Sequence, residues 1–267
     1  MKNALDIALE TDIGQGDITS NALFSKSHRT TAVIIAKDQG MLAGTGEAVY
    51  VFRKCGASAK ALKRDGAWIK RGDTVMRITG PARGVLCAER TALNIISRMS
   101  GIATATAKLA KTVAVAATRK SPPGMTLLDK KAVAIGGGLT HRLGLWDMTL
   151  IKDTHLDSIS HDRTQAIREA MRKAKKPVEI EVNSTREALL AAKLGAGMVM
   201  LDNFSPAQAK KTVREMRKNY PEAIIEISGG VNQKNLRDFA EAKPDFISLG
   251  MLTAAAKPLD FSMKIAK

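Results

Sequence analysis

Three cationic side chains come directly after two apolar runs of this sequence. Arg119 and Lys120 follow the run at 113–117, and Lys152 follows the run at 148–151. Both runs have the length and composition of buried strands. Cations just beyond the carboxyl ends of buried parallel strands lie where α/β barrels and open α/β sheets bind ligands. Each charge alone fits an exposed loop equally well, but the set favours an anion-binding site.

Carboxylates and glycines follow the other predicted strands. If those strands converge on one mouth, their last residues add Glu181, Asp202, Ser228, Gly229, Gly230 and Gly250. The two carboxylates can hold a magnesium ion or the hydroxyls of a ribose. Glycines after the last two strands expose backbone N–H groups, which in barrels cradle a phosphate. The set therefore predicts two ligands, an aromatic or aliphatic acid and a phosphorylated sugar.

Several of these residues also have a plain structural explanation. Glu179 and Glu181 alternate along one strand, and either can be a buried acid paired with a lysine. The glycine pair at 229–230 marks a turn as readily as a phosphate site. His141 stands between the triple glycine at 136–138 and Arg142. We favour a site role for His141 over that of an ordinary loop histidine.

Alternating strands and helices must position these residues. We expect strands at 113–117, 148–152, 178–182, 197–202, 223–228 and 246–250. We expect helices at 160–176, 184–194, 206–218 and 232–241. Repeated β-α units imply a parallel sheet with right-handed crossovers. Six units are fewer than the eight of a closed barrel, so an open, incomplete TIM-like barrel is predicted.

The first part of the chain has a different organisation. Short strands and one helix between residues 30 and 80 favour an α/β sandwich. A long helix is expected from 85 to 111, broken at Ser100-Gly101. The alternating tail at 254–267 is expected to pack back on the first domain. The predicted domains are residues 1–103, with that tail, and residues 104–253.

Composition excludes several classes of protein. The chain has 267 residues and no apolar run of about 18 residues, so no membrane span is expected. Two isolated cysteines suggest no disulfide framework, which indicates the cytoplasm. The formal charge of +16 suits nucleic acid, an acidic membrane face or acidic small substrates. Aromatic residues make up only 4%, which argues against single-strand binding and leaves a basic nucleic-acid-binding protein as an alternative.

Taken together and in order, these motifs resemble the quinolinate phosphoribosyltransferase family, also called nicotinate-nucleotide pyrophosphorylase. The resemblance covers nearly the whole chain. It is carried by the motifs at 89–94, 100–104, 118–120, 136–138, 141–142, 151–153, 179–182, 201–204 and 228–230. It implies an N-terminal sandwich, an open barrel, and a dimer or a hexamer of dimers. It also implies that quinolinate attacks phosphoribosyl pyrophosphate, giving nicotinate mononucleotide, pyrophosphate and carbon dioxide in NAD biosynthesis, with magnesium as cofactor.

The resemblance also implies a role for each residue. The carboxylates of quinolinate would be gripped by Arg119, His141 and Arg142, and Lys120 and Lys152 would pair with carboxylate and pyrophosphate. Glu181 and Asp202 would face the ribose and magnesium, and Thr118 and Ser228 would contact substrate. The 5′-phosphate would lie on Gly229, Gly230 and Gly250. The catalytic set would be Lys120, Lys152, Glu181 and Asp202, and Arg90 would reach into the neighbouring subunit's site.

A few positions depart from the family pattern. Thr154 stands where asparagine is usual, Thr140 precedes His141 in place of asparagine, and Ser121 replaces a common threonine. These loop positions bear on fine specificity more than on reaction class. A paralogous group associated with molybdate-uptake operons shares the fold and the run at 141–145. It usually lacks the full triple glycine and the lysine at 152, so it is the second alternative.

Overall fold

The structure is a computed structural model that describes residues 2–159, 162–174 and 177–266. It contains two compact units. The first comprises the described parts of 1–108, 121–137 and 252–267, and the second comprises 109–120 and 138–251. The predicted boundary after residue 103 falls inside helix α4 (Ala82–Leu109). Residues 121–137, predicted in the second domain, belong to the first unit, where Asp129 of helix α5 (Thr126–Ile135) pairs with Arg98 of α4.

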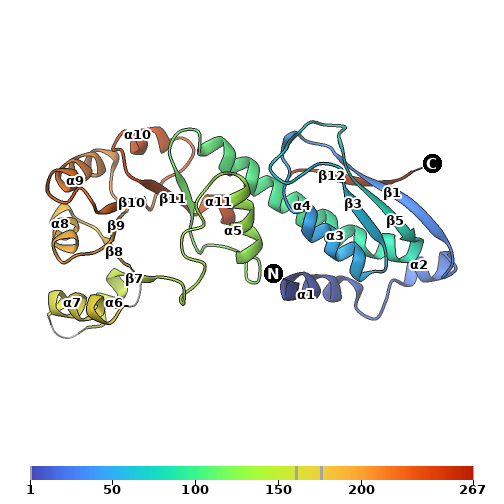
Figure 1. The fold of residues 1–267 in the computed structure, drawn as a ribbon, viewed down its shortest axis with the longest axis horizontal. Coiled ribbons are helices and arrows are strands. Elements are labelled where there is room, and N and C mark those ends of the chain that lie inside the picture. Colours follow the sequence, from blue (N-terminus) through green and yellow to red (C-terminus); the bar gives the residue numbers. More distant parts are fainter. Residues whose placement is uncertain (1, 160–161, 175–176, 267) are drawn as a thin grey trace. The chain divides into compact units, whose positions relative to one another are not determined.

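The first unit is built on a four-stranded antiparallel sheet in the order β12-β1-β5-β3. Its strands are β1 (Arg29–Ala36), β3 (Ser58–Ala61), β5 (Thr74–Pro81) and β12 (Phe261–Ile265). A small ribbon joins β2 (Gly40–Met41) to β4 (Trp68–Ile69). The helices are α1 (Lys2–Ile13), α2 (Ile18–Leu23), α3 (Thr45–Lys54), α4 and α5. In β1 every second residue from Ala32 is buried, so one sheet face belongs to the core and an α/β sandwich results (Figure 1).

Helix α4 is continuous for 28 residues, so the predicted break at Ser100-Gly101 is wrong. The two residues serve close packing instead. A Cβ on Gly101 would lie 2.2 Å from the carbonyl oxygen of Lys257, so only glycine allows the chain to pass there. The hydroxyl of Ser100 accepts a hydrogen bond from the backbone N–H of Ala43, at 2.9 Å. Tertiary contacts therefore explain why two small residues, Ser100 and Gly101, occur inside a helix in a pattern typical of a helix end.

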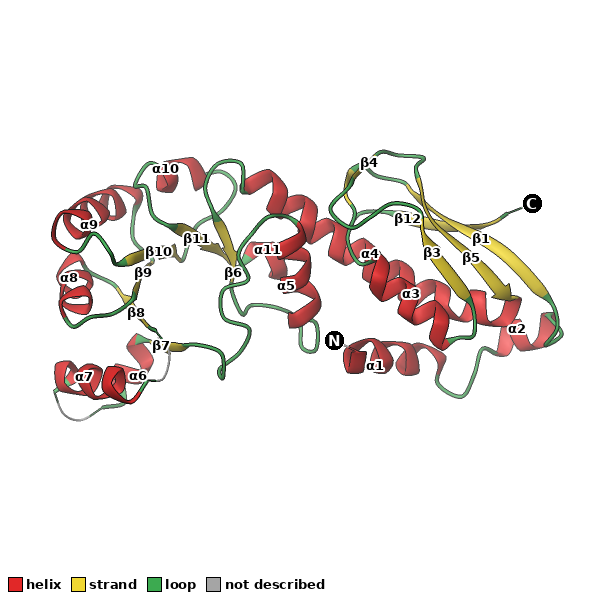
Figure 2. Cartoon of the chain, in the orientation of Figure 1, coloured by secondary structure: helices red, strands yellow, loops and turns green. Residues whose placement is uncertain are grey.

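The second unit contains a curled sheet of six parallel strands in the order β6-β11-β10-β9-β8-β7 (Figure 2). The strands are β6 (Val115–Ala117), β7 (Thr149–Ile151), β8 (Val178–Val182), β9 (Met198–Asp202), β10 (Ile224–Ser228) and β11 (Phe246–Leu249). The helices are α6 (Asp153–Asp157), α7 (Arg163–Lys173), α8 (Thr185–Lys193), α9 (Pro206–Asn219) and α10 (Leu236–Ala240). Helix α11 (Met251–Ala254) follows β11, and all of it except Met251 belongs to the first unit. The predicted open barrel is confirmed, because β6 and β7 remain edge strands.

Strand β8 of this half-barrel alternates apolar and acidic residues. In β8, Val178, Ile180 and Val182 alternate with Glu179 and Glu181, and all of them except Glu181 are buried. Side chains two residues apart lie on one face of a strand, so both glutamates face the same way. Helices α7, α8 and α9 begin at side-chain caps; in α9 the Ser205 hydroxyl accepts a hydrogen bond from Gln208 N–H, and Pro206 follows.

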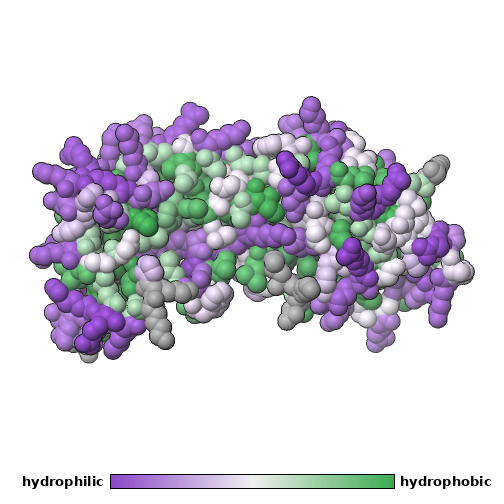
Figure 3. Space-filling view, viewed as in Figure 1, coloured by the Kyte–Doolittle hydropathy of each residue, from purple (hydrophilic) through white to green (hydrophobic). Residues whose placement is uncertain are grey.

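The surface of the half-barrel unit is polar over its helices. On the face shown in Figure 3, hydrophilic side chains gather over α8 and α9. Exposed cations of α9 contribute to this surface, namely Lys210, Lys211, Arg214 and Lys218. No helix in the described ranges is long and apolar enough to cross a membrane.

Candidate active site

A cavity of about 410 Å³ opens at the carboxyl ends of the half-barrel strands. Eleven of the residues predicted from sequence line it: Thr118, Arg119, Lys120, His141, Arg142, Lys152, Glu181, Asp202, Ser228, Gly229 and Gly230. Parallel strands bring their carboxyl ends to one edge, so residues more than a hundred positions apart meet here. Five further lining residues were not predicted: Leu150, Met200, Asn203, Glu226 and Ser248.

Two predicted site residues lie outside that lining. Gly250 follows β11 and packs against the segment after β6, where its Cβ would lie 3.1 Å from Lys120 Cδ. A side chain at 250 would therefore require the Lys120 side chain to shift slightly. Arg90 is exposed on α4, in the first compact unit.

An ion pair joins the ends of two neighbouring strands. Lys152 Nζ lies 2.5 Å from Glu181 Oε2, and the two side chains are 38% and 9% exposed. The backbone of Lys152 is fixed as well, since its N–H donates to Nδ1 of His155 at 2.9 Å. The pair places one cation and one carboxylate at the cavity mouth in a defined orientation.

Asp202 ends the next strand. Burial raises the pKa of Asp202 and the charge of Glu181 adds to the effect, although Lys152 opposes it. Its carboxylate accepts a hydrogen bond of 2.7 Å from the amide of Asn203. Two partly desolvated carboxylates that repel each other are stabilised by any cation placed between them. Glu181 and Asp202 therefore fit a hard divalent ion, which prefers oxygen ligands.

The turn after β10 requires glycine. Gly229 has φ of 80°, and its Cβ would lie 2.4 Å from Asn203 Oδ1. Gly230 also has positive φ, 66°, but a Cβ there would meet nothing within 4 Å. Asn235 donates to the Gly230 carbonyl oxygen at 3.0 Å and holds the turn. Backbone without side chains therefore borders the cavity on this side, as binding of a phosphate requires.

Two arginines line the cavity without an ion-pair or hydrogen-bond partner among the described residues. Arg142 is 7% exposed. Burial lowers the pKa of Arg142, the charge of Arg119 lowers it further, and Glu179 and Glu181 act in the opposite sense. Like charges held together in a partly buried cavity are a ready site for a carboxylate, which binds guanidinium bidentately.

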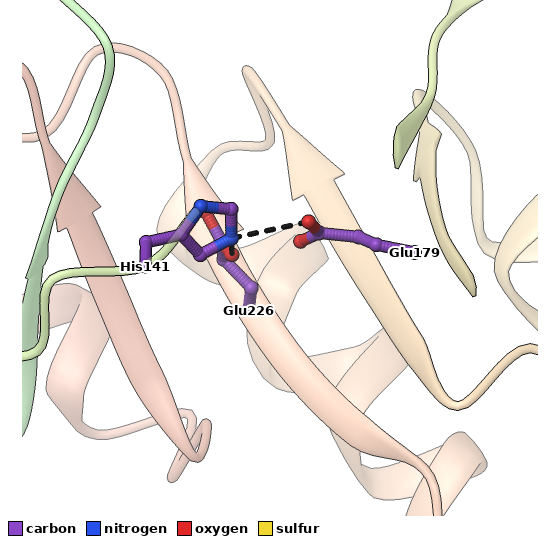
Figure 4. Close-up of side chains that lie close together, drawn as sticks. All are labelled: His141, Glu179 and Glu226. Carbon is purple, nitrogen blue, oxygen red and sulfur yellow. Dashed lines mark ion pairs between the residues drawn. The ribbon is translucent and has the colours of Figure 1, made fainter. Parts of the chain in front are cut away.

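His141 contacts two buried glutamates at once (Figure 4). Its Nε2 lies 3.1 Å from Glu179 Oε2 and 3.0 Å from Glu226 Oε2. Both glutamates are 0% exposed, and the ring packs on Phe246 with centroids 6.0 Å apart. Neither contact is a well-aligned hydrogen bond, and the carboxylate oxygens have no other hydrogen-bond partner among the described residues. We therefore treat the three groups as an ionic cluster.

The cluster changes how its members titrate. Burial disfavours the charged imidazole, but the contacts with Glu179 and Glu226 outweigh it and raise the pKa of His141 to about 9. Burial raises the pKa of Glu179 to about 7, with His141 opposing and Glu226 adding to the effect. The two glutamates therefore favour the charged form of His141, beside Arg142.

The sequence contains a pattern that indicates a site position for Glu179 and Glu226, although neither is among the predicted site residues. Glu179 lies two residues before Glu181, and Glu226 lies two residues before Ser228. The alternation of a strand puts each on the same face as the strand-end residue. The sequence allows a lysine as the partner of a buried Glu179, but in the structure its partner is His141.

Comparison with known proteins identifies the family of the chain. Residues 17–100 match the model of the quinolinate phosphoribosyl transferase N-terminal domain, and residues 98–264 match that of the C-terminal domain. The rat nicotinate-nucleotide pyrophosphorylase (carboxylating) is 37% identical over 91% of this chain and 84% of its own. The protein of the same name from Archaeoglobus fulgidus, called probable, is 41% identical over 94% and 98%. The solved structure of the nicotinate-nucleotide pyrophosphorylase from Francisella tularensis superposes with a TM-score of 0.90 at 33% identity, covering 98% of this chain and 94% of that one.

Proposed function

Because this chain belongs to the quinolinate phosphoribosyl transferase family, we propose that it transfers a phosphoribosyl group from phosphoribosyl pyrophosphate to quinolinate. The pyridine nitrogen forms a bond to C1 of the ribose, and the bond from C1 to the pyrophosphate oxygen breaks. The bond to the 2-carboxylate then breaks, carbon dioxide leaves, and C2 takes a proton from solvent. The products are nicotinate mononucleotide, pyrophosphate and carbon dioxide, as a step of NAD synthesis.

The observation that carries the proposal is the charge pattern of one cavity. Three cationic groups, Arg119, Arg142 and His141, line the same cavity as the carboxylates of Glu181 and Asp202. Cations match the two carboxylates of quinolinate, and carboxylates match the positive charge that grows on the ribose in the transition state. Catalysis then consists mainly of positioning two polyanions against each other.

Each remaining group has a role in this scheme. Lys120 and Lys152 neutralise carboxylate and pyrophosphate, while Thr118 and Ser228 donate hydrogen bonds to substrate. Gly229, Gly230 and Gly250 hold the 5′-phosphate on bare backbone. Magnesium would be held by Glu181 and Asp202, directly or through water, and would supply positive charge to the departing pyrophosphate.

We further propose an oligomer, a dimer or a hexamer of dimers, in which Arg90 completes the site of a neighbouring subunit. The exposed position of Arg90 on α4 supports this assembly. Mixing Arg90→Ala subunits with Lys152→Ala subunits should then restore activity in hybrids that contain one intact site. The two free cysteines support the cytoplasm as the compartment.

The direct test is incubation of the purified chain with quinolinate, phosphoribosyl pyrophosphate and magnesium. We expect quinolinate-dependent release of carbon dioxide and formation of the mononucleotide. Turnover of a different anionic substrate in place of quinolinate would favour the molybdate-operon paralogue. Absence of product together with tight, salt-sensitive binding of nucleic acid would favour the nucleic-acid-binding alternative.

A further inference from the structure

The two glutamates beneath His141 have no role in the scheme above, although burying them is costly. Both side chains are 0% exposed, and an ionised carboxylate out of water needs a compensating partner. Their partner is Nε2 of His141, at 3.1 Å from Glu179 and 3.0 Å from Glu226. Glu179 also acts electrostatically on Arg142. The two acids therefore lie under the two most buried cations of the cavity.

The backbone brings His141 to this place at a cost. Its φ is 49°, in the left-handed region that residues other than glycine seldom occupy. The chain is tied on either side. Leu139 exchanges hydrogen bonds with Val115 and Ala117 at the edge of β6, and Leu143 N–H donates to Asp147 at 2.9 Å. The ring is thereby turned toward Glu179 on β8 and Glu226 on β10.

The ring of His141 packs against one aromatic residue and lines two cavities. Phe246 packs on it, and a second cavity of about 310 Å³ behind it is lined mainly by apolar residues, among them Met148, Met198 and Ile224. With Nε2 occupied by the glutamates, Nδ1 is the only ring nitrogen left to bind substrate. No hydrogen bond engages Nδ1 among the described residues.

We propose that Glu179 and Glu226 are positioning residues that hold the His141 ring by Nε2, so that Nδ1–H and the ring charge are presented to a carboxylate of the acid substrate. This inference rests on the proposed function and deepens it. It attributes part of the affinity for quinolinate to Glu179 and Glu226, which do not contact the substrate. The raised pKa of His141 agrees with a ring that stays charged at neutral pH.

The first test is the pair of variants Glu179→Gln and Glu226→Gln, which keep size and remove charge. We expect KM for quinolinate to rise about tenfold for either, with KM for phosphoribosyl pyrophosphate unchanged, since about one pKa unit of interaction with the cation is lost. Glu179→Asp and Glu226→Asp keep the charge and should recover part of the affinity. Glu47→Gln is the matched control, because Glu47 is a buried acid that pairs with Lys131 at 2.6 Å outside the cavity.

A double-mutant cycle separates positioning from a general effect on folding. If the glutamates act only through His141, the variant His141→Gln/Glu226→Gln binds quinolinate no more weakly than His141→Gln alone. Additive losses in the cycle would overturn the inference. An unchanged KM for quinolinate in the two glutamine variants would also overturn the inference. The same holds if the native protein binds one divalent metal ion tightly and the glutamine variants do not.

The ¹⁵N chemical shifts of the His141 ring report its protonation state. A general loss of stability in a variant that still folds would not change them. In the native protein at neutral pH both ring nitrogens should show the shifts of an imidazolium. In Glu226→Gln one should move toward the neutral form, whereas Glu47→Gln should leave both unchanged. A native enzyme without phosphoribosyl transfer would refute the proposed function, and an active enzyme with a neutral His141 would refute only this inference.

Discussion

Lys152 and Glu181 face each other across two neighbouring parallel strands, with Nζ 2.5 Å from Oε2. Because both residues end their strands at the cavity, the pair orients a cation for substrate rather than filling the core. We predict that Lys152→Ala lowers turnover about 100-fold, the scale of a lost electrostatic contact at a reacting centre. Stability should fall by less than about 1 kcal/mol, since Lys152 is partly exposed.

Steady-state rates and thermal melts of Lys152→Ala and Lys210→Ala test this prediction. Lys210 pairs with Glu241 at 3.4 Å on the exposed side of α9, so its loss should change neither quantity. Near-normal turnover in Lys152→Ala would remove this lysine from the site.

The turn after β10 predicts a difference between two glycines. Gly229→Ala forces a methyl group to within 2.4 Å of Asn203 Oδ1 at a φ of 80°, so the turn must move. We expect KM for phosphoribosyl pyrophosphate to rise at least about tenfold, because backbone donors then miss the phosphate. Gly72 has φ of 93° but open space around it. Gly72→Ala should cost about 1 kcal/mol of stability and leave KM for phosphoribosyl pyrophosphate unchanged. Equal KM values in the two variants would contradict phosphate binding by the turn after β10.

Asp129 predicts a large stability effect within the first unit. Its carboxylate is 0% exposed and accepts two hydrogen bonds of 2.7 Å from Arg98, which also donates to the Thr253 carbonyl oxygen. Asp129→Asn leaves the guanidinium without a charged partner, and we expect a loss of about 3–5 kcal/mol in chemical denaturation. Asp157→Asn removes the partner of Arg163 in a pair that is more than half exposed, and it should change stability by less than about 1 kcal/mol. Similar losses of stability in both variants would contradict a special structural role for the buried Asp129–Arg98 pair.

The cluster around His141 predicts how binding depends on pH. Glu179 on β8 and Glu226 on β10 face the imidazole, with Arg142 adjoining, and the pKa of His141 is raised from 6.5 to about 9. Loss of the imidazolium charge should therefore weaken quinolinate affinity near pH 9 and not near 6.5, separately from the ionisation of Glu179 near 7. The raised pKa also stabilises the fold fully below 6.5, and this contribution is lost as pH rises toward 9. Calorimetric titration with quinolinate across this range is the measurement, and a decline centred on 6.5 would show an unperturbed histidine.

Local patterns were sufficient for most of the fold. Apolar runs, helix caps such as Ser205-Pro206 and the β-α alternation located all six strands of the half-barrel. They failed at Gly101, where a glycine inside α4 looks like a helix end. Nothing near Gly101 in sequence reveals that Lys257 packs against it, since the two are far apart along the chain.

The sequence by itself determined which chemical groups stand at the strand ends, because a strand's end and its alternating faces are local properties. Arg119, Lys152, Glu181 and Asp202 could be named on that ground. Only the tertiary structure decided that Glu226 and Glu179 share Nε2 of His141. That contact depends on the curl of the sheet and on a left-handed turn at His141, and both are set by packing between segments that no local pattern connects.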